Sequence, residues 1–217
     1  MGRPDLSPGI AVDEEPPREG VAFELGSPCV GTFTGQLVNL VMPARETIDI
    51  EDIAHALANL CRFGGHTQYF YSVAEHCCHA HDLCQVNGPD AALAALLHDA
   101  HEAYLGDWTR PLQCALPHRV AEELRWIRQA VDVAIRQAFD SDVHWWGRND
   151  CHEADRLLLA AEARMLMKKS KDWKLGRGTP IALPCWEPGV AKDMFLQRFH
   201  GTQKLIRDNV TKAGQGE

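Results

Sequence analysis

Residues 93–107 place four ionisable side chains at the end of an apolar helix, within a little over one turn. The stretch reads LAALLHDAHEAYLGD, and the four side chains are His98, Asp99, His101 and Glu102. Burying that many ionisable groups costs several kcal/mol unless they are paired or bind a metal ion. Adjacent helical residues project about 100° apart, so His98 and Asp99 can share an ion only if it lies over the helix face between them. The fold must therefore bring further polar ligands to this stretch.

The chain offers two such ligands on other segments with helical apolar spacing. His76 lies in YSVAEHCC and Asp155 in CHEADRLLL. Taken alone, a histidine on an apolar face is more often a core residue, and a single aspartate usually faces solvent. Together with His98 and Asp99, however, they form a set of two imidazoles and two carboxylates from three helices. Such a set suits one divalent ion (Mn²⁺, Fe²⁺, Co²⁺, Zn²⁺ or Mg²⁺) and leaves positions for water and a substrate oxygen.

The remaining pattern predicts an all-α domain of about six helices with a small N-terminal β-hairpin. The hairpin is expected from two short runs, VAFEL and GQLVNLVM, separated by GSPCVGTFTG within residues 21–42. Residues 1–20 are rich in Pro, Gly and acidic residues and predict a flexible tail, whereas residues 21–217 predict one domain with a loose C-terminal end. Pro111 and Pro117 predict a loop. Helical spacing covers residues 49–61, 67–86, 93 onward, 118–139, 151–167 and 190–208.

Composition limits the class of protein. The 217 residues are 45% hydrophobic and 24% charged, which is typical of a globular domain with its own core. No apolar run reaches the roughly 18 residues of a membrane span, and the polar start MGRPDLSPG is not a signal peptide, so we expect a cytoplasmic protein without a membrane partner. The eight cysteines form no CxxC pair and are expected to be reduced. The net charge of −8 argues against stable nucleic-acid binding.

The order H…HD…D, with the His-Asp pair closing an apolar helix, resembles the HD-domain metal-dependent phosphohydrolases. AALLHDAHEAYLGDWTRPLQ is similar to the HD(A)xE…GD…P segment of HD-type 5′-deoxynucleotidases, the YfbR-like group. DIAHALANLCRFGGHTQYFYSVAEH looks closest to a phage and prophage branch, the YfdR-like proteins, and EADRLLLAAEARML and PGVAKDMFLQRF fit its later helices. The resemblance covers roughly residues 32–207 and implies an HD-domain helical bundle.

The resemblance also implies roles for individual residues. His76, His98, Asp99 and Asp155 correspond to the family's metal ligands. Glu102 matches a carboxylate that orients the nucleophilic water or the phosphate. Asp107 matches an acidic residue for catalysis or substrate positioning, and Arg62 matches an arginine that contacts phosphate. Phe63 stands where those nucleotidases often place a Trp that stacks on the base, which puts base selectivity in question.

Other polar residues near these segments are also candidates for contacts with the substrate or the metal ligands. His66 follows Gly64-Gly65 and is a candidate phosphate contact, and Arg110 is a candidate contact for additional phosphate groups. His79 and His81 make HCCHAH look like a metal cluster, but we expect them to face solvent or to lie behind the ligands. His101 points away from Asp99 on a helix and is expected on the substrate side or at the surface.

We expect a metal-dependent nucleotide phosphohydrolase, most simply a 5′-deoxynucleotidase that converts a dNMP to deoxynucleoside and phosphate. Its partners would be a small-molecule nucleotide and further copies of itself, as a dimer or larger homo-oligomer. The alternatives are a dNTP triphosphohydrolase that releases triphosphate, and a non-catalytic module that senses nucleotides. An HD-fold di-iron oxygenase is a further alternative, but it would need additional His ligands.

Overall fold

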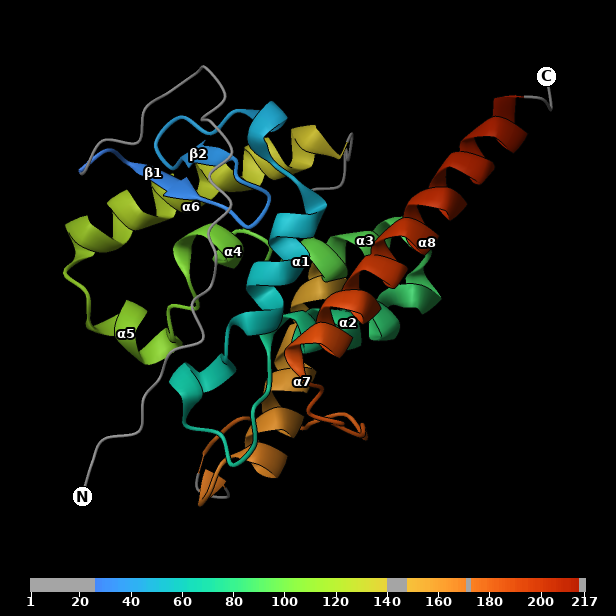
Figure 1. The fold of residues 1–217 in the computed structure, drawn as a ribbon. Coiled ribbons are helices and arrows are strands. Elements are labelled where there is room, and N and C mark those ends of the chain that lie inside the picture. Colours follow the sequence, from blue (N-terminus) through green and yellow to red (C-terminus); the bar gives the residue numbers. More distant parts are fainter. Residues whose placement is uncertain (1–25, 140–147, 171–172, 215–217) are drawn as a thin grey trace, which may run out of the picture.

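Most of the chain is helical in the computed structural model, which describes residues 26–139, 148–170 and 173–214 (Figure 1). The six expected helices are present, together with two short ones, α4 and α5. Among the described residues, no helix combines the length and apolarity needed to cross a bilayer. The helices are α1 (Ile50–Asn59), α2 (Val73–Cys84), α3 (Pro89–Leu97), α4 (Glu102–Leu105), α5 (Arg110–Ala115), α6 (His118–Ala138), α7 (Asn149–Leu166) and α8 (Pro188–Gly214), and 3₁₀ turns cover Arg45–Thr47, Arg62–Gly65 and Gln85–Asn87.

The small N-terminal hairpin is present, but its first strand was placed wrongly. Strand β1 (Cys29–Gly31) pairs antiparallel with β2 (Leu37–Asn39), with Val30 opposite Val38. The segment GSPCVGTFTG, expected as a loop, therefore contains β1, because the chain reverses later, at a turn where Gly35 has a φ of 86°. VAFEL lies outside the described residues, as do the expected tail of residues 1–20 and the last three residues.

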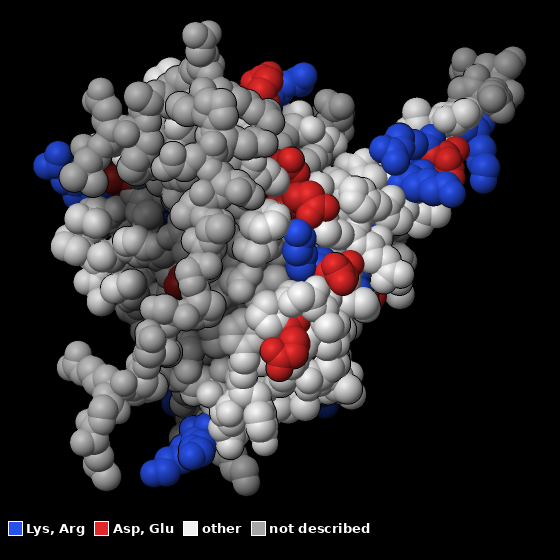
Figure 2. All heavy atoms as spheres, in the orientation of Figure 1, with Lys and Arg blue, Asp and Glu red and all other residues white. Residues whose placement is uncertain are grey.

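Helix α3 lies at the centre of the hydrophobic core. Every side chain from residue 91 to 97 is at most 2% exposed, because α3 packs against α2, α7 and α8. Burying a side chain such as Leu93, Leu96 or Leu97 contributes roughly 1.5–3 kcal/mol. In contrast, the C-terminal part of α8 extends away from this core, and Figure 2 shows basic side chains gathered on it. The core therefore forms around the helix that leads directly into the His-Asp pair.

The central helix is shorter than predicted. It ends at Leu97, and His98 and Asp99 lie in a tight turn before α4. In that turn the backbone bonds connect residues three apart, from Ala100 N to Leu97 O (3.0 Å) and from Glu102 N to Asp99 O (2.9 Å). Helix α5 replaces the predicted loop at Pro111, which stands in its first turn, where the absent N–H costs little.

Helix α2 begins at Val73, six residues later than predicted, because Ser72 caps it. The Ser72 hydroxyl accepts a hydrogen bond from Glu75 N (3.1 Å), as is typical of a residue that ends an extended segment and starts a helix. The residues before it pair with the end of α1 instead, through bonds from Arg62 N to Tyr71 O and from Val73 N to Leu60 O, both 2.9 Å. This pairing holds the start of α2 against the turn that follows α1.

We predict that Ser72→Ala lowers the free energy of unfolding by about 1 kcal/mol, because Glu75 N loses its acceptor at a buried helix start. Urea denaturation at neutral pH measures the change. Ser72→Thr keeps the hydroxyl and serves as the control. A Ser72→Ala protein as stable as wild type would contradict the capping role.

Candidate metal centre

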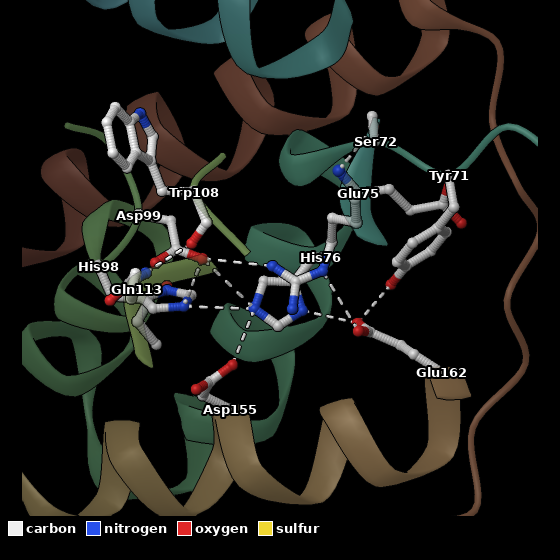
Figure 3. A network of polar contacts seen from close by, with 12 residues as sticks. Tyr71, Ser72, Glu75, His76, His98, Asp99, Trp108, Gln113, Asp155 and Glu162 are labelled. Atoms are coloured by element: carbon white, nitrogen blue, oxygen red, sulfur yellow. Dashed lines mark hydrogen bonds and ion pairs between the residues drawn. The ribbon is translucent and has the colours of Figure 1, made fainter. Parts of the chain in front are cut away.

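Three elements bring the four predicted ligands together (Figure 3). His76 comes from α2, His98 and Asp99 from the turn after α3, and Asp155 from α7. The Nε2 atom of His76 lies 3.3 Å from His98 Nε2, 3.2 Å from Asp155 Oδ1 and 3.7 Å from Asp99 Oδ2. His98 Nε2 in turn lies 3.1 Å from Asp99 Oδ2. In Figure 3 the two aspartates lie on opposite sides of the His76 ring.

The hydrogen bonds of the two imidazoles fix their tautomers. His76 Nδ1 lies 2.6 Å from Glu162 Oε1, and His98 Nδ1 lies 2.7 Å from the Ala95 carbonyl oxygen. Both partners are acceptors, so in the neutral imidazoles both Nδ1 atoms carry the proton and both Nε2 atoms present a lone pair. Two lone pairs that face each other at 3.3 Å need a positive charge beside them. A carboxylate or carbonyl behind a ligating imidazole is also the usual arrangement at metal sites. The donor set therefore fits a metal ion.

The cluster is buried except on one side. The side chain of His76 is fully buried, whereas those of His98 and Asp99 are about 15% exposed. The side chain of Asp155 is 41% exposed, although its apolar neighbours predicted burial. Water and a small ligand can therefore reach the cluster from the side of Asp155.

The electrostatics of the cluster favour a cation. Burial opposes ionisation of Asp99, but the adjacent His98 and His76 hold the pKa of Asp99 well below its usual value. Likewise, burial opposes the charged form of His98, but Asp99 raises the pKa of this imidazole well above its usual value. For Asp155, the hydrogen bond and charge of His76 outweigh burial and lower the pKa to about 2. Without a metal ion, protons on the imidazoles therefore balance the negative charge of the carboxylates.

A second layer of polar groups surrounds His76. The carboxylate of Glu162, on α7, is fully buried and accepts hydrogen bonds from His76 and from the Tyr71 hydroxyl (2.9 Å). The guanidinium of Arg62 lies 3.3 Å from Glu162 Oε2 and 3.4 Å from Asp99 Oδ2. Burial opposes ionisation of Glu162, but Arg62 and His76 lower its pKa to about 2. Arg62 therefore joins the carboxylate behind His76 to one of the proposed ligands.

Glu102 and Asp107 lie beside the cluster as candidates for catalysis. One carboxylate oxygen of Glu102 lies within 4.8 Å of a carboxylate oxygen of Asp99 and a ring nitrogen of His101. Its Oε2 atom is buried without a hydrogen-bond partner in the part of the chain that the structure describes. Burial, Asp99 and Asp107 raise the pKa of Glu102 well above its usual value. Burial also raises the pKa of Asp107, whose carboxylate feels the charges of Arg62 and Asp99.

The predicted substrate-binding residues divide into two groups. Arg62 contacts the cluster, and its guanidinium carbon lies 5.9 Å from the centre of the Phe63 ring. In contrast, His66 is exposed and lines a cavity of about 420 Å³ together with Tyr69 and Lys168. None of the proposed ligands lines that cavity, so it is not the expected site of the substrate phosphate. Arg110 is exposed at the start of α5.

The other histidines are more buried than expected. His79 is 8% exposed, and its ring stacks on Trp186 with ring centres 5.6 Å apart. His81 is 2% exposed, with Nε2 2.9 Å from the Thr202 hydroxyl. A position at the surface is therefore wrong for both. It is also wrong for His101, which is 5% exposed with Nδ1 3.2 Å from Asp132. These contacts come from α6, from α8 and from Trp186 just before α8, and the local pattern around each histidine does not reveal them.

Sequence reasoning missed Glu162, although a signal for it was present. Glu162 follows Asp155 by seven residues, which is about two helical turns and therefore the same face of α7. It also missed Cys77, whose sulfur lies within 4.8 Å of a ring nitrogen of His98 and a carboxylate oxygen of Asp99. Burial raises the pKa of the Cys77 thiol, so it stays protonated at neutral pH.

The fold and the cluster define an all-α protein with buried His, Asp and Cys groups that could hold a metal ion. No family model matches the chain. The chain is 33% identical over 183 residues to the uncharacterized protein YfdR of Escherichia coli, a match that covers 81% of this chain and 96% of YfdR. It is 43% identical over 90 residues to an uncharacterized protein of Rhodobacter capsulatus, covering 39% of this chain and 46% of that relative. The chain therefore belongs to the YfdR family.

We predict that Glu162→Gln lowers the affinity for Mn²⁺ or Co²⁺ about 10- to 100-fold, because the charge that orients His76 and raises its basicity is lost. Titration calorimetry of the metal-free protein measures the affinity. Glu153→Gln, an exposed position on the same helix, is the matched control. Equal affinities for the two variants would contradict the role of Glu162.

Proposed function

We propose that this protein is an HD-domain metal-dependent phosphohydrolase of the 5′-deoxynucleotidase type, which hydrolyses a dNMP to deoxynucleoside and phosphate. One observation carries the proposal: the Nε2 atoms of His76 and His98 face each other at 3.3 Å, flanked by the carboxylates of Asp99 and Asp155. The order of these ligands along the chain, and the resemblance of the surrounding segments to the 5′-deoxynucleotidases, support the same reading.

The four ligands would hold one divalent ion, from among Co²⁺, Mn²⁺, Zn²⁺, Fe²⁺ and Mg²⁺. When bound, such an ion makes a water more acidic and neutralises charge on a phosphoryl oxygen. Phosphoryl transfer depends mainly on positioning and charge neutralisation, so the protein needs no covalent nucleophile. The partial exposure of Asp155 supplies a route by which a phosphate ester reaches the ligands.

The neighbouring residues would orient the reactants. Glu102 has a carboxylate oxygen within 4.8 Å of one of Asp99, and its Oε2 has no hydrogen-bond partner among the described residues. Its carboxyl can therefore hold the attacking water and accept or return a proton. Arg62 contacts Asp99 through Nη1 and Glu162 through Nε, and the remaining N–H groups of its guanidinium would donate to a phosphoryl oxygen. Asp107 lies close enough to interact with the charge of Arg62 and would help to position the substrate.

A monophosphate suits the charge of this site. One ion and Arg62 can neutralise a phosphoryl group of charge about −2, whereas a triphosphate brings about four negative charges and needs further cations. Arg110, the nearest candidate in the sequence, is exposed at the start of α5 and does not line the cavity at His66. The triphosphohydrolase is therefore the second choice, and analysis of the products separates the two.

We predict that purified protein releases orthophosphate from dNMPs, that EDTA stops the reaction and that Mn²⁺ or Co²⁺ restores it. Asp99→Ala should lose both bound metal and activity while keeping its helical circular dichroism, because the core around α3 does not depend on the ion. Asp193→Ala, an exposed position on α8, is the control. Full metal occupancy in Asp99→Ala would refute the site. Intact tripolyphosphate released from dNTPs, with dNMPs unchanged, would overturn the choice of substrate.

We predict that Glu102→Ala keeps its metal but loses about 10²- to 10⁴-fold in kcat, because an orienting and proton-transferring group contributes about that much. Elemental analysis and steady-state rates on the preferred dNMP measure the two quantities separately. Glu123→Ala, exposed on α6, should behave like wild type. A Glu102→Ala protein with near wild-type kcat, or one that loses metal together with activity, would rule out this role.

A further inference from the structure

A cavity of about 170 Å³ lies between α4, α5 and α6, next to the proposed metal centre. Its wall includes Glu102 and His101, and a polar atom of each lies within 4.8 Å of a carboxylate oxygen of Asp99. The smaller of the two cavities is therefore the one that adjoins the ligands. The sequence assigned Glu102 to the water or the phosphate and expected His101 on the substrate side or at the surface, but it gave no role to Trp108, Arg125 or Arg128.

About half of the wall of this cavity is apolar, and it includes one aromatic ring that is held by hydrogen bonds. Leu105, Leu116 and Leu124 supply aliphatic surface, and Trp108 supplies an indole that is 36% exposed. The indole N–H donates to the Leu105 carbonyl oxygen (2.9 Å), and the Gln113 amide donates to the Trp108 carbonyl oxygen (2.5 Å). These two hydrogen bonds hold Trp108, the residue after Asp107, in one orientation. The ring is therefore positioned before any ligand binds.

Two arginines of α6 complete the wall, and they are not equivalent. Arg128 lies 3.7 Å from Asp132, the buried carboxylate that also contacts His101. Arg125 is exposed, and no ion pair joins it to another of the residues that the structure describes. Arg128 thus balances a buried charge, whereas the guanidinium of Arg125 is available to a ligand. A guanidinium donates only, so that ligand must offer acceptor atoms.

We propose that this cavity binds the base of the nucleotide, with Trp108 against the ring and Arg125 donating to its acceptor edge. The proposal rests on the proposed function, because the phosphate is taken to lie at His98 and Asp99. The occupant is a base because an aromatic ring with polar edges matches a wall in which Trp108 and the leucines stand beside polar groups. The nucleoside of a bound 5′-nucleotide also extends from the phosphate into adjoining space. The stacking residue is then Trp108 in place of Phe63.

Binding and hydrolysis of matched ligands test the proposal. Metal-loaded wild type, Trp108→Ala, Trp108→Phe and Trp126→Ala are titrated with deoxynucleoside 5′-monophosphates and with 2-deoxyribose 5-phosphate, which lacks the base. Trp108→Ala should weaken nucleotide binding about tenfold to a hundredfold and leave deoxyribose phosphate unchanged. Trp108→Phe should restore most of the loss. Trp126, exposed on α6 and outside the cavity, is the matched control.

Four outcomes would overturn the proposal. Trp108→Ala and Trp126→Ala could have equal effects, or Trp108→Ala could weaken both ligands alike. Phe63→Ala could instead produce the selective loss, which would move the base to the turn after α1. If Arg125→Ala weakened dNTPs but not dNMPs, with Arg119→Ala as the exposed control, the cavity would hold the phosphate tail and not the base.

Measuring binding separately from turnover distinguishes this inference from the proposed function. Nucleotides that bind in a Trp108-dependent way without being hydrolysed would support the cavity and refute the enzyme. Hydrolysis of deoxyribose phosphate and dNMPs at equal efficiency, unaffected by Trp108→Ala, would support the enzyme and refute the cavity. Wild-type protein that binds no nucleotide would refute both.

Discussion

The hydrogen bond between Glu162 and His76 is the interaction on which the rest of the candidate site depends. It joins two fully buried side chains at 2.6 Å and fixes the tautomer that turns His76 Nε2 toward the other ligands. A buried carboxylate is costly unless it is paired and hydrogen-bonded. Here the Tyr71 hydroxyl donates to Oε1, and Arg62 forms an ion pair with Oε2 at 3.3 Å. Loss of either partner would leave the buried charge of Glu162 less well compensated. Orientation of the ligand and stability of the core are therefore coupled.

The second imidazole is oriented by the end of a helix. The last carbonyls of a helix have no intrahelical partners, and α3 ends one residue before His98. The Ala95 carbonyl oxygen accepts from His98 Nδ1 at 2.7 Å, so the side chain satisfies the helix end and is held in place by it. A longer helix, as the sequence pattern predicted, would use that carbonyl for the backbone. Ending α3 at Leu97 thus places His98 and Asp99 where they meet α2 and α7.

The sequence predicted those parts of the fold that local periodicity determines. Apolar spacing located six helices, and the change in pattern near the N-terminus indicated a hairpin, although β1 fell in the expected loop. It could not show that His81 reaches Thr202 on α8 or that His101 reaches Asp132 on α6, because these contacts join residues far apart in the sequence. Glu162 was within reach of the same reasoning, because its spacing from Asp155 puts both carboxylates on one face of α7. The start of α2 was missed because the pairing of Arg62 with Tyr71 overrides helical propensity.

The turn after α1 connects the metal ligands to the proposed substrate cavity. Phe63 has a φ of 56°, a conformation that costs a residue with a side chain on the order of 1–3 kcal/mol and persists only where the surroundings enforce it. Arg62 supplies that enforcement through its ion pairs and its backbone bond to Tyr71. A Cβ added at Gly64 would lie 3.7 Å from Thr109 Cγ2, so the turn packs against the residue that follows Trp108. The strained turn therefore holds Arg62 near the ligands and the Asp107–Trp108 segment beside the cavity, which joins the two ends of the proposed nucleotide site.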